Sequence, residues 1–161
     1  FFYKLLVEYP NADELSEVVS RTTEGLKADV KRVVDGSMLL ELQHLVQQVP
    51  VASHVKEYAV RLVLATHPNT ETALEITNQF LRFGSSPRGA QTLLLGAKVR
   101  ALTEGRFNVS YDDIAALSLP ALRHRLILNF EAEAEGVTSD FVLKTILAEV
   151  PRDISASSPA S

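Results

Sequence analysis

The 161-residue sequence contains no cysteine. Disulfides, thiol catalysis and cysteine-based zinc sites are therefore excluded, and the absence fits a reducing compartment such as the cytoplasm. No apolar run approaches the roughly 20 residues that a membrane-spanning helix needs, and no signal peptide is visible. The formal net charge is −4, which argues against a protein built mainly to bind nucleic acid, because such a protein has a basic surplus.

The sequence also lacks the common signatures of catalytic and metal sites. No two of its four histidines have the i, i+4 spacing of an H-E-x-x-H motif, so no metal site is expected. No G-x-S-x-G motif marks a nucleophile elbow. The carboxylates fall at positions that suit helix caps and solvated faces. We therefore expect no catalytic residue within this chain.

What is present is the composition of one globular domain, with 46% hydrophobic and 22% charged residues. Apolar residues recur mostly at helical spacing, between residues that cap or break helices. This pattern predicts a mostly α-helical bundle, in which helix packs on helix. Helices are expected over about 11–25, 38–48, 53–66, 87–104, 111–119 and 139–150, and short strands near 80–83 and 126–128. The predicted caps of these helices, apart from the one at 87–104, are Asn11, Ser37, Ser53, Ser110 and Thr138.

Several stretches fit no long helix. Residues 26–35 are expected to form a short strand or an extended connector, 70–79 a loop with one helical turn, and 131–136 an acidic loop. Pro120 is expected to start another turn. The small polar residues 152–161 are expected to form a flexible tail.

Residues 1–9, with the sequence FFYKLLVEY, predict a β-strand that is apolar on both faces. Such a strand belongs in a parallel sheet covered on both sides, and nothing later in the chain can supply that sheet. The chain also begins without methionine, so we expect it to be a piece of a longer protein. Without its sheet, the strand is expected to fold back on the helices or to pair with a second copy. The expected boundaries are 1–9 for this strand, 10–151 for the helical domain and 152–161 for the tail.

The segment GSSPRG, residues 84–89, precedes the strongest helical pattern in the chain. Ser86 suits the N-cap and Pro87 suits the first helical position. Arg88 is unusual there, because a cation in the first turn opposes the helix dipole by about 0.3–1 kcal/mol. A bound phosphate would make the arginine favourable there, since helix N–H groups and a guanidinium both bind phosphate. Gly89 would leave the backbone uncovered beside it. The alternative is an ion pair between Arg88 and one of the chain's own carboxylates.

A P-loop is excluded, and one further basic group is a weaker candidate for phosphate binding. The glycine spacing of GSSPRG is similar to that of a P-loop, but Ala90 and Gln91 stand where a P-loop needs lysine followed by serine or threonine. Arg123, His124 and Arg125 form a second basic patch. This patch is either a solvated helix end, where cations suit the dipole, or a surface that faces phosphate or another subunit.

Four stretches, FFYKLLVEYPNADE, LLELQHLVQQVPVASHVKEYAVRLVLATH, FGSSPRGAQTLLLGAKVRALTEGRFNVSYDDI and LPALRHRLILNFEAEAEGVTSDFVLKTIL, follow one another along residues 1–150. In this order they resemble the last core strand, the first lid helices, the sensor 2 segment with its helix, and the terminal section of one family, the MoxR class of AAA+ ATPases. The GSSPRG and LRHRLIL pieces are the specific ones. The resemblance implies a helical AAA+ lid preceded by one strand of the ATPase core.

The resemblance also implies a nucleotide site. Arg88 corresponds to the sensor 2 arginine, which contacts the terminal phosphate of ATP. Tyr9 and Pro10 correspond to the linker that passes the adenine. Gly89 is a mild departure from the family pattern that should leave the phosphate contact intact. The residues expected to bind nucleotide are Arg88, Pro87, Ser86, Tyr9 and Pro10.

For the longer parent protein, the resemblance implies ATP and Mg²⁺ as cofactors and a homo-oligomeric ring, a hexamer, as the assembly. The lid would contact its own ATPase core and couple nucleotide state to ring conformation and client remodelling. A von Willebrand A-type partner protein is expected, with no nucleic acid and no transmembrane segment. Walker A and Walker B motifs are absent from this chain, and they supply phosphate cradling and Mg²⁺ binding. By itself the chain is therefore expected not to hydrolyse ATP.

Two other functions remain to be weighed. The chain could be an autonomous helical protein-interaction module, in which SSPRG is only a helix cap. A P-loop in the sequence before Phe1 would support the lid instead. Nucleic-acid binding through a helix-turn-helix is disfavoured by the acidic pI and by the lack of a basic helical stripe.

Overall fold

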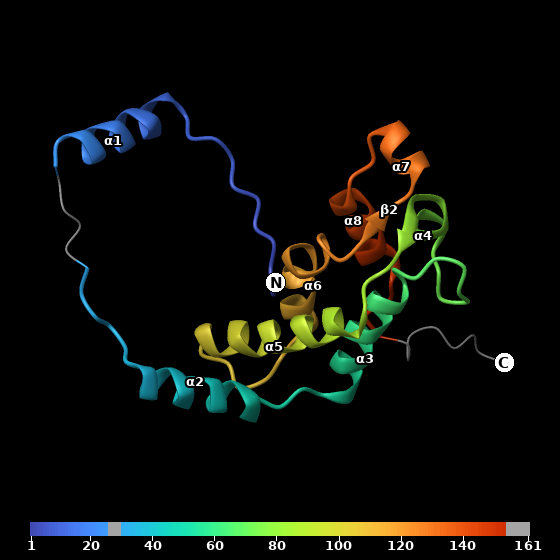
Figure 1. Ribbon diagram of the computed structural model, residues 1–161. Coiled ribbons are helices and arrows are strands. Elements are labelled where there is room, and N and C mark those ends of the chain that lie inside the picture. The colour runs from blue at the N-terminus through green and yellow to red at the C-terminus, as the bar shows by residue number, and fades with distance from the viewer. Residues whose placement is uncertain (26–29, 154–161) are drawn as a thin grey trace.

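The computed structural model describes residues 1–25 and 30–153 (Figure 1). These residues form a mostly helical structure with one small two-stranded sheet, which confirms the predicted fold class. In chain order the elements are α1 (Ala12–Thr23), α2 (Gly36–Gln48), α3 (Ser53–Leu64), α4 (Glu75–Phe80), β1 (Leu81–Phe83), α5 (Pro87–Thr103), α6 (Tyr111–Leu122), β2 (Ile127–Leu128), α7 (Phe130–Glu135) and α8 (Ser139–Glu149).

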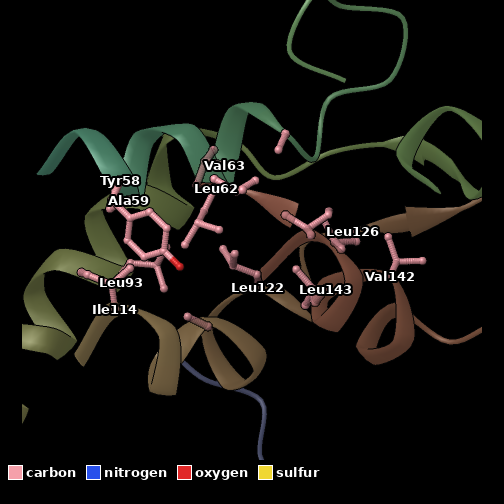
Figure 2. Packing of buried hydrophobic residues seen from close by; sticks show 14 of the residues in the cluster. Tyr58, Ala59, Leu62, Val63, Leu93, Ile114, Leu122, Leu126, Val142 and Leu143 are labelled. Carbon is pink, nitrogen blue, oxygen red and sulfur yellow. The ribbon is translucent and has the colours of Figure 1, made fainter. Parts of the chain in front are cut away.

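Helix α5 is the centre of the packed part of the chain. It lies along α6 and α3 and also contacts α2, where the Lys98 ammonium donates to the Gln47 carbonyl oxygen over 2.9 Å (Figure 1). Helix α8 packs against α6 and α4. The large side chains that are fully buried between these helices, most of them drawn in Figure 2, are Tyr58, Leu62, Leu93, Ile114, Leu122, Val142, Leu143 and Ile146.

The two predicted short strands are confirmed, and they form one antiparallel pair. Leu81 lies opposite Leu128 and Phe83 opposite Ile127, with an irregularity between the two pairs. The Asn129 amide also donates to the Gln79 carbonyl oxygen over 2.6 Å. The sheet thus ties the chain before α5 to the chain before α7, and it places residues 84–86 directly at the start of α5.

Three of the five predicted helix caps outside α5 are confirmed. The Asn11 side chain accepts from the Glu14 N–H over 3.0 Å at the start of α1. The Ser110 hydroxyl accepts from the Asp113 N–H while the Asp113 carboxylate accepts from the Ser110 N–H, and the Thr138 hydroxyl caps α8. Ser37 and Ser53 instead lie within the first turns of their helices. Asp35 is the cap of α2, because its carboxylate reaches the Met38 N–H over 2.9 Å; α3 has no side-chain cap.

The structure assigns no strand to residues 1–9, so the prediction of a strand there is wrong for this chain. A β-strand exists only through hydrogen bonds with a neighbouring strand, and β1 and β2 pair with each other. Residues 1–4 instead fold back on the helices, which is one of the two outcomes expected without a sheet. The Lys4 N–H donates to the Pro120 carbonyl oxygen of α6 over 2.9 Å.

Helices α1 and α2 contain no buried residue. Helix α2 lies beside α5 without burying a side chain, whereas α1 lies far from the packed helices (Figure 1). Within the predicted strand or connector 26–35, residues 30–35 form neither helix nor strand up to the cap at Asp35, and 26–29 lie outside the described residues. Most of the predicted tail, 154–161, also lies outside them.

Two local predictions are wrong. The acidic loop predicted for 131–136 is helix α7, because the Asn129 side chain caps it and Gly136 ends it at a left-handed φ of 69°. Pro120 lies inside α6 instead of starting another turn. Proline removes one hydrogen bond from a helix interior, but the next two residues, Ala121 and Leu122, are buried in the core and hold the last turn in place. In 70–79 the expected helical turn is the start of α4.

Candidate functional site

Helix α5 begins as the sequence predicts, with Ser86 as the N-cap and Pro87 as the first helical residue. The Ser86 hydroxyl makes no capping hydrogen bond. The Gly89 N–H donates to the Ser86 carbonyl oxygen over 2.8 Å. The Ser86 side chain therefore accepts no hydrogen bond from the backbone N–H groups of the first turn.

Arg88 is exposed, and its guanidinium makes no hydrogen bond, ion pair or ring contact with any of the described residues. The alternative prediction, an ion pair with one of the chain's own carboxylates, is therefore wrong for the described chain. Every other arginine there has at least one such contact. These partnered arginines are Arg21, Arg32, Arg61, Arg82, Arg100, Arg106, Arg123, Arg125 and Arg152.

Gly89 is buried, so the expectation that it leaves the backbone uncovered is wrong. A Cβ at this position would overlap the Ser85 hydroxyl oxygen and lie 2.9 Å from a methyl carbon of Leu122. The glycine instead allows the first turn of α5 to approach both the preceding loop and α6.

Tyr9 and Pro10 lie in the exposed segment that leads to α1, and Tyr9 is 99% exposed. This segment runs away from the start of α5 (Figure 1). Within the described residues, no hydrogen bond or ring contact joins it to Ser86, Pro87 or Arg88. The structure thus brings three of the five predicted nucleotide-binding residues together and leaves the other two apart.

The basic patch makes its contacts within the chain. Arg123 is mostly buried, forms an ion pair of 2.9 Å with Asp140 of α8, and donates to the Lys4 carbonyl oxygen over 3.3 Å. The Nε2 atom of His124 lies 3.4 Å from the Phe1 carbonyl oxygen. Burial, with a further contribution from the charge of Arg125, lowers the pKa of His124.

Arg125 connects three parts of the molecule. Its guanidinium donates to the Ala121 carbonyl oxygen at the end of α6 and to the Phe1 carbonyl oxygen, both over 2.9 Å. It also donates to the Thr92 hydroxyl of α5 over 3.1 Å. Thr92 in turn donates to the Arg88 carbonyl oxygen over 2.8 Å. Arg125 is therefore hydrogen-bonded to α5 one turn after Arg88.

Tyr3 packs against α5 at Gly96. A Cβ at Gly96 would overlap the Tyr3 hydroxyl and lie 3.0 Å from a methyl carbon of Leu117. Burial raises the pKa of Tyr3. Residues 1–4 are therefore held on α5 and α6 by the basic patch and by one aromatic side chain, a contact that no local sequence pattern signals.

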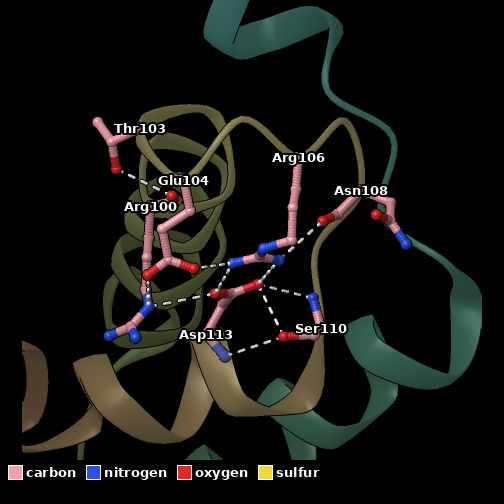
Figure 3. A network of polar contacts seen from close by, with 7 residues as sticks. All are labelled: Arg100, Thr103, Glu104, Arg106, Asn108, Ser110 and Asp113. Carbon is pink, nitrogen blue, oxygen red and sulfur yellow. Dashed lines mark hydrogen bonds and ion pairs between the residues drawn. The ribbon is translucent and has the colours of Figure 1, made fainter.

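A polar network fixes the other end of α5 to α6 (Figure 3). Asp113 is 1% exposed and accepts two hydrogen bonds from Arg106, over 2.6 and 2.8 Å, and another from the Ser110 N–H. Arg100 and Glu104 complete the network. Burial alone would raise the pKa of Asp113, but the hydrogen bonds from Arg106 and Ser110 outweigh it and lower the pKa to about 2. The sequence predicts the cap at Ser110 but not the two arginines.

Two searches of the described residues were negative. Residues 1–25 and 30–153 contain no group of three or more histidine, aspartate and glutamate side chains placed to hold a metal ion. None of the helices in these ranges combines the length and the apolar character that crossing a membrane requires.

Comparisons with known proteins agree with this fold. Residues 73–146, from the loop before α4 into α8, match the AAA lid domain family. The chain is 29% identical over 150 residues to "Chaperone MoxR1" of Mycobacterium tuberculosis, covering 93% of this chain and 40% of that protein. It is 31% identical over 153 residues to "Uncharacterized protein YeaC" of Bacillus subtilis, covering 93% of this chain and 44% of that protein.

A crystal structure of "a putative ATPase" from Cytophaga hutchinsonii matches the fold with a TM-score of 0.85 and 31% identity, over 94% of this chain and 46% of that one. The chain thus spans less than half of the length of these relatives. The fold and the family match define an AAA lid domain. Together, the family match, the MoxR relative and the structural match support a C-terminal lid of a MoxR-class AAA+ ATPase.

Proposed function

We propose that this lid senses nucleotide and that Arg88 contacts the terminal phosphate of ATP. The observation that carries the proposal is the exposed guanidinium at the start of α5, which is without a partner among the described residues. A cation at a helix N-terminus is unfavourable by about 0.3–1 kcal/mol. The other arginines of the described residues have partners within the chain, so the Arg88 guanidinium is available to an external anion.

The chemistry of the first turn of α5 fits a phosphate. The guanidinium can form two parallel hydrogen bonds to phosphate oxygens. The backbone N–H groups of the first turn point in the same direction as the positive end of the helix dipole. Ser86 does not cap this turn with its side chain, so a phosphate would not compete with a side-chain acceptor there.

The remaining parts of the proposal concern the longer protein. ATP supplies the phosphate charge, and Mg²⁺ would be held outside this chain, because the described residues contain no suitable cluster of carboxylates. We infer a ring of AAA+ subunits in which Arg88 couples nucleotide state to ring conformation and client remodelling, in the cytoplasm and with a von Willebrand A-type partner. Tyr9 and Pro10 beside the adenine, and Ser86 and Pro87 beside the phosphate, belong to this proposal.

The test is the affinity of the full-length protein for a non-hydrolysable ATP analogue and for ADP, measured by calorimetry. We expect Arg88→Ala to weaken binding of the analogue about 10- to 100-fold, the loss typical of a charge-assisted pair of hydrogen bonds, with ADP affected much less. Arg88→Lys should recover part of the loss. Arg82→Ala is the matched control, because Arg82 is exposed on β1 and its guanidinium lies over the Phe83 ring without an ion pair among the described residues.

Unchanged affinity of Arg88→Ala for the ATP analogue would overturn the proposal. It would favour the alternative of an autonomous interaction module, for which the exposed apolar faces of α1 and α2 are the supporting observation. In that case substitutions on α1 or α2 would abolish partner binding and Arg88→Ala would not.

A further inference from the structure

The loop before Arg88 is attached to the C-terminal end of α3. The Ser85 N–H donates to the Thr66 hydroxyl oxygen over 2.9 Å, and Thr66 donates its own proton to the Val63 carbonyl oxygen over 2.6 Å. Ser85 and Thr66 are both 0% exposed. Because water cannot replace either partner at this depth, the bond between them must be made inside the protein.

His67 holds the other backbone polar group of the same residue. Its Nε2 atom lies 2.7 Å from the Ser85 carbonyl oxygen. A carbonyl oxygen only accepts, so Nε2 carries the hydrogen in this contact. Ser85 is therefore bound at its N–H by Thr66 and at its C=O by His67, two consecutive residues of the turn that follows α3.

Two glycines let the loop lie this close. A Cβ at Gly84 would overlap the Thr66 carbonyl oxygen and the His67 ring, and a Cβ at Gly89 would overlap the Ser85 hydroxyl. Gly84 does not have a positive φ, so space and not backbone conformation requires glycine there. The glycines of GSSPRG thus serve the attachment of the loop, on one side to α3 and on the other to α5.

We propose that Thr66 and His67 are positioning residues for Arg88. The Arg88 guanidinium makes no hydrogen bond, ion pair or ring contact with the described residues that would orient it. The direction of its side chain depends on where the first turn of α5 lies, and the peptide that leads into that turn is held by α3. This inference rests on the proposed function, because it gives Thr66 and His67 the role of orienting an arginine that binds phosphate.

The experiment uses the full-length protein and two readouts, the affinity for the non-hydrolysable ATP analogue and amide hydrogen exchange of residues 84–88 without nucleotide. His67→Leu should speed exchange in the loop and weaken binding about fivefold, the effect of losing one net hydrogen bond. His67→Gln keeps an N–H at a similar reach and should restore most of both. His44→Leu, on the exposed face of α2, should change neither.

Comparing His67→Leu with its parent in an Arg88→Ala background shows whether His67 acts through Arg88 or affects nucleotide binding independently of it. If His67 acts through Arg88, His67→Leu has no further effect on affinity there. A fivefold loss that persists in that background overturns the inference and leaves the proposed function intact. Wild-type affinity of Arg88→Ala overturns both.

Thr66 provides a second pair of variants if His67→Leu fails to fold. Thr66→Val keeps the shape and removes the hydroxyl that accepts from Ser85, while Thr66→Ser keeps the hydroxyl. We expect Thr66→Val to weaken binding of the analogue and Thr66→Ser to leave it close to wild type. Equal affinities for these two variants, with equal loop exchange, would overturn the inference.

Discussion

Helices α1 and α3 are the same length and carry the same kind of apolar stripe, yet only one of them is packed. Helix α3 buries Tyr58 and Leu62 almost completely. Helix α1 buries no residue, and Leu15 on its stripe is 51% exposed. The spacing of apolar residues therefore shows which face of a helix needs a cover, but not whether this chain provides the cover.

Local interactions alone hold α1. It has a capping box between Asn11 and Glu14 and an exposed ion pair between Glu17 and Arg21. Such features contribute a few tenths of a kcal/mol to about 1 kcal/mol each, and an isolated helix of this length is marginal in water. The stability of the described chain is therefore expected to lie in the region from α3 to α8.

The largest effect should come from a core substitution. Leu93→Ala removes a side chain that is fully buried in α5, and we expect it to lower the free energy of unfolding by about 2–5 kcal/mol because a cavity remains. Leu15→Ala on α1 should change it by less than about 0.5 kcal/mol. Denaturant unfolding of the two variants checks the contrast, and a comparable loss for both would show that α1 is packed.

The next effect depends on pH. Asp113 has a pKa of about 2 in the folded protein against an ordinary value near 3.9. Its charged form therefore stabilises the fold by about 2 kcal/mol above pH 5, and this contribution is lost as the pH falls towards 2. Unfolding curves at several pH values should be less pH-dependent for Asp113→Asn than for the wild type.

The exposed ion pair on α1 gives the matching control for that pH series. Glu17→Gln removes it and should shift stability by less than about 0.5 kcal/mol at every pH. If the wild type and Asp113→Asn lose the same free energy between pH 5 and 2, the network of Asp113 is not a source of stability.

A smaller effect should come from the contact between residues 1–4 and the packed helices. Gly96→Ala places a Cβ where the Tyr3 hydroxyl lies, so it should cost about 1 kcal/mol less in a Tyr3→Ala background than in the wild type. Removing Tyr3 also lets the better helix propensity of alanine act at position 96. A double-mutant cycle by denaturant unfolding measures this difference. Strictly additive effects would mean that Tyr3 does not occupy this place in solution.

The smallest effect on stability should be that of Arg88→Ala, at most about 0.5 kcal/mol in either direction, because the side chain is exposed and opposes the helix dipole. A thermal melt of the chain compared with wild type is sufficient. A drop of several degrees in Tm would show that Arg88 supports the fold and was not left available for a ligand.

Features that depend on neighbouring residues were predictable from the sequence. The start of α5, the capping box of Ser110 and both short strands follow from local pattern and turn chemistry, and the structure confirms them. Arg88 was identifiable for the same reason, because its charge is unusual for its position in a helix.

Features that depend on distant residues were not predictable. The glycines at 84, 89 and 96 look like conformational residues in the sequence, but each makes room for an atom of another element. The attachment of Ser85 to Thr66 and His67 spans a gap of 18 or 19 residues that no periodicity reveals. The strand expected over 1–9 does not form, because its apolar pattern is typical of a strand inside a larger sheet. The described residues do not contain such a sheet.

The docking of residues 1–4 has a consequence for the order of events during synthesis. The bonds from Arg123 to Lys4 and from Arg125 to Phe1 join residues 119 and 124 positions apart. At about 5–20 residues per second, the ribosome takes on the order of ten seconds to make the chain between them. Residues 1–4 can thus reach their place only after residue 125 has been made, and their aromatic side chains stay available to chaperones throughout that interval.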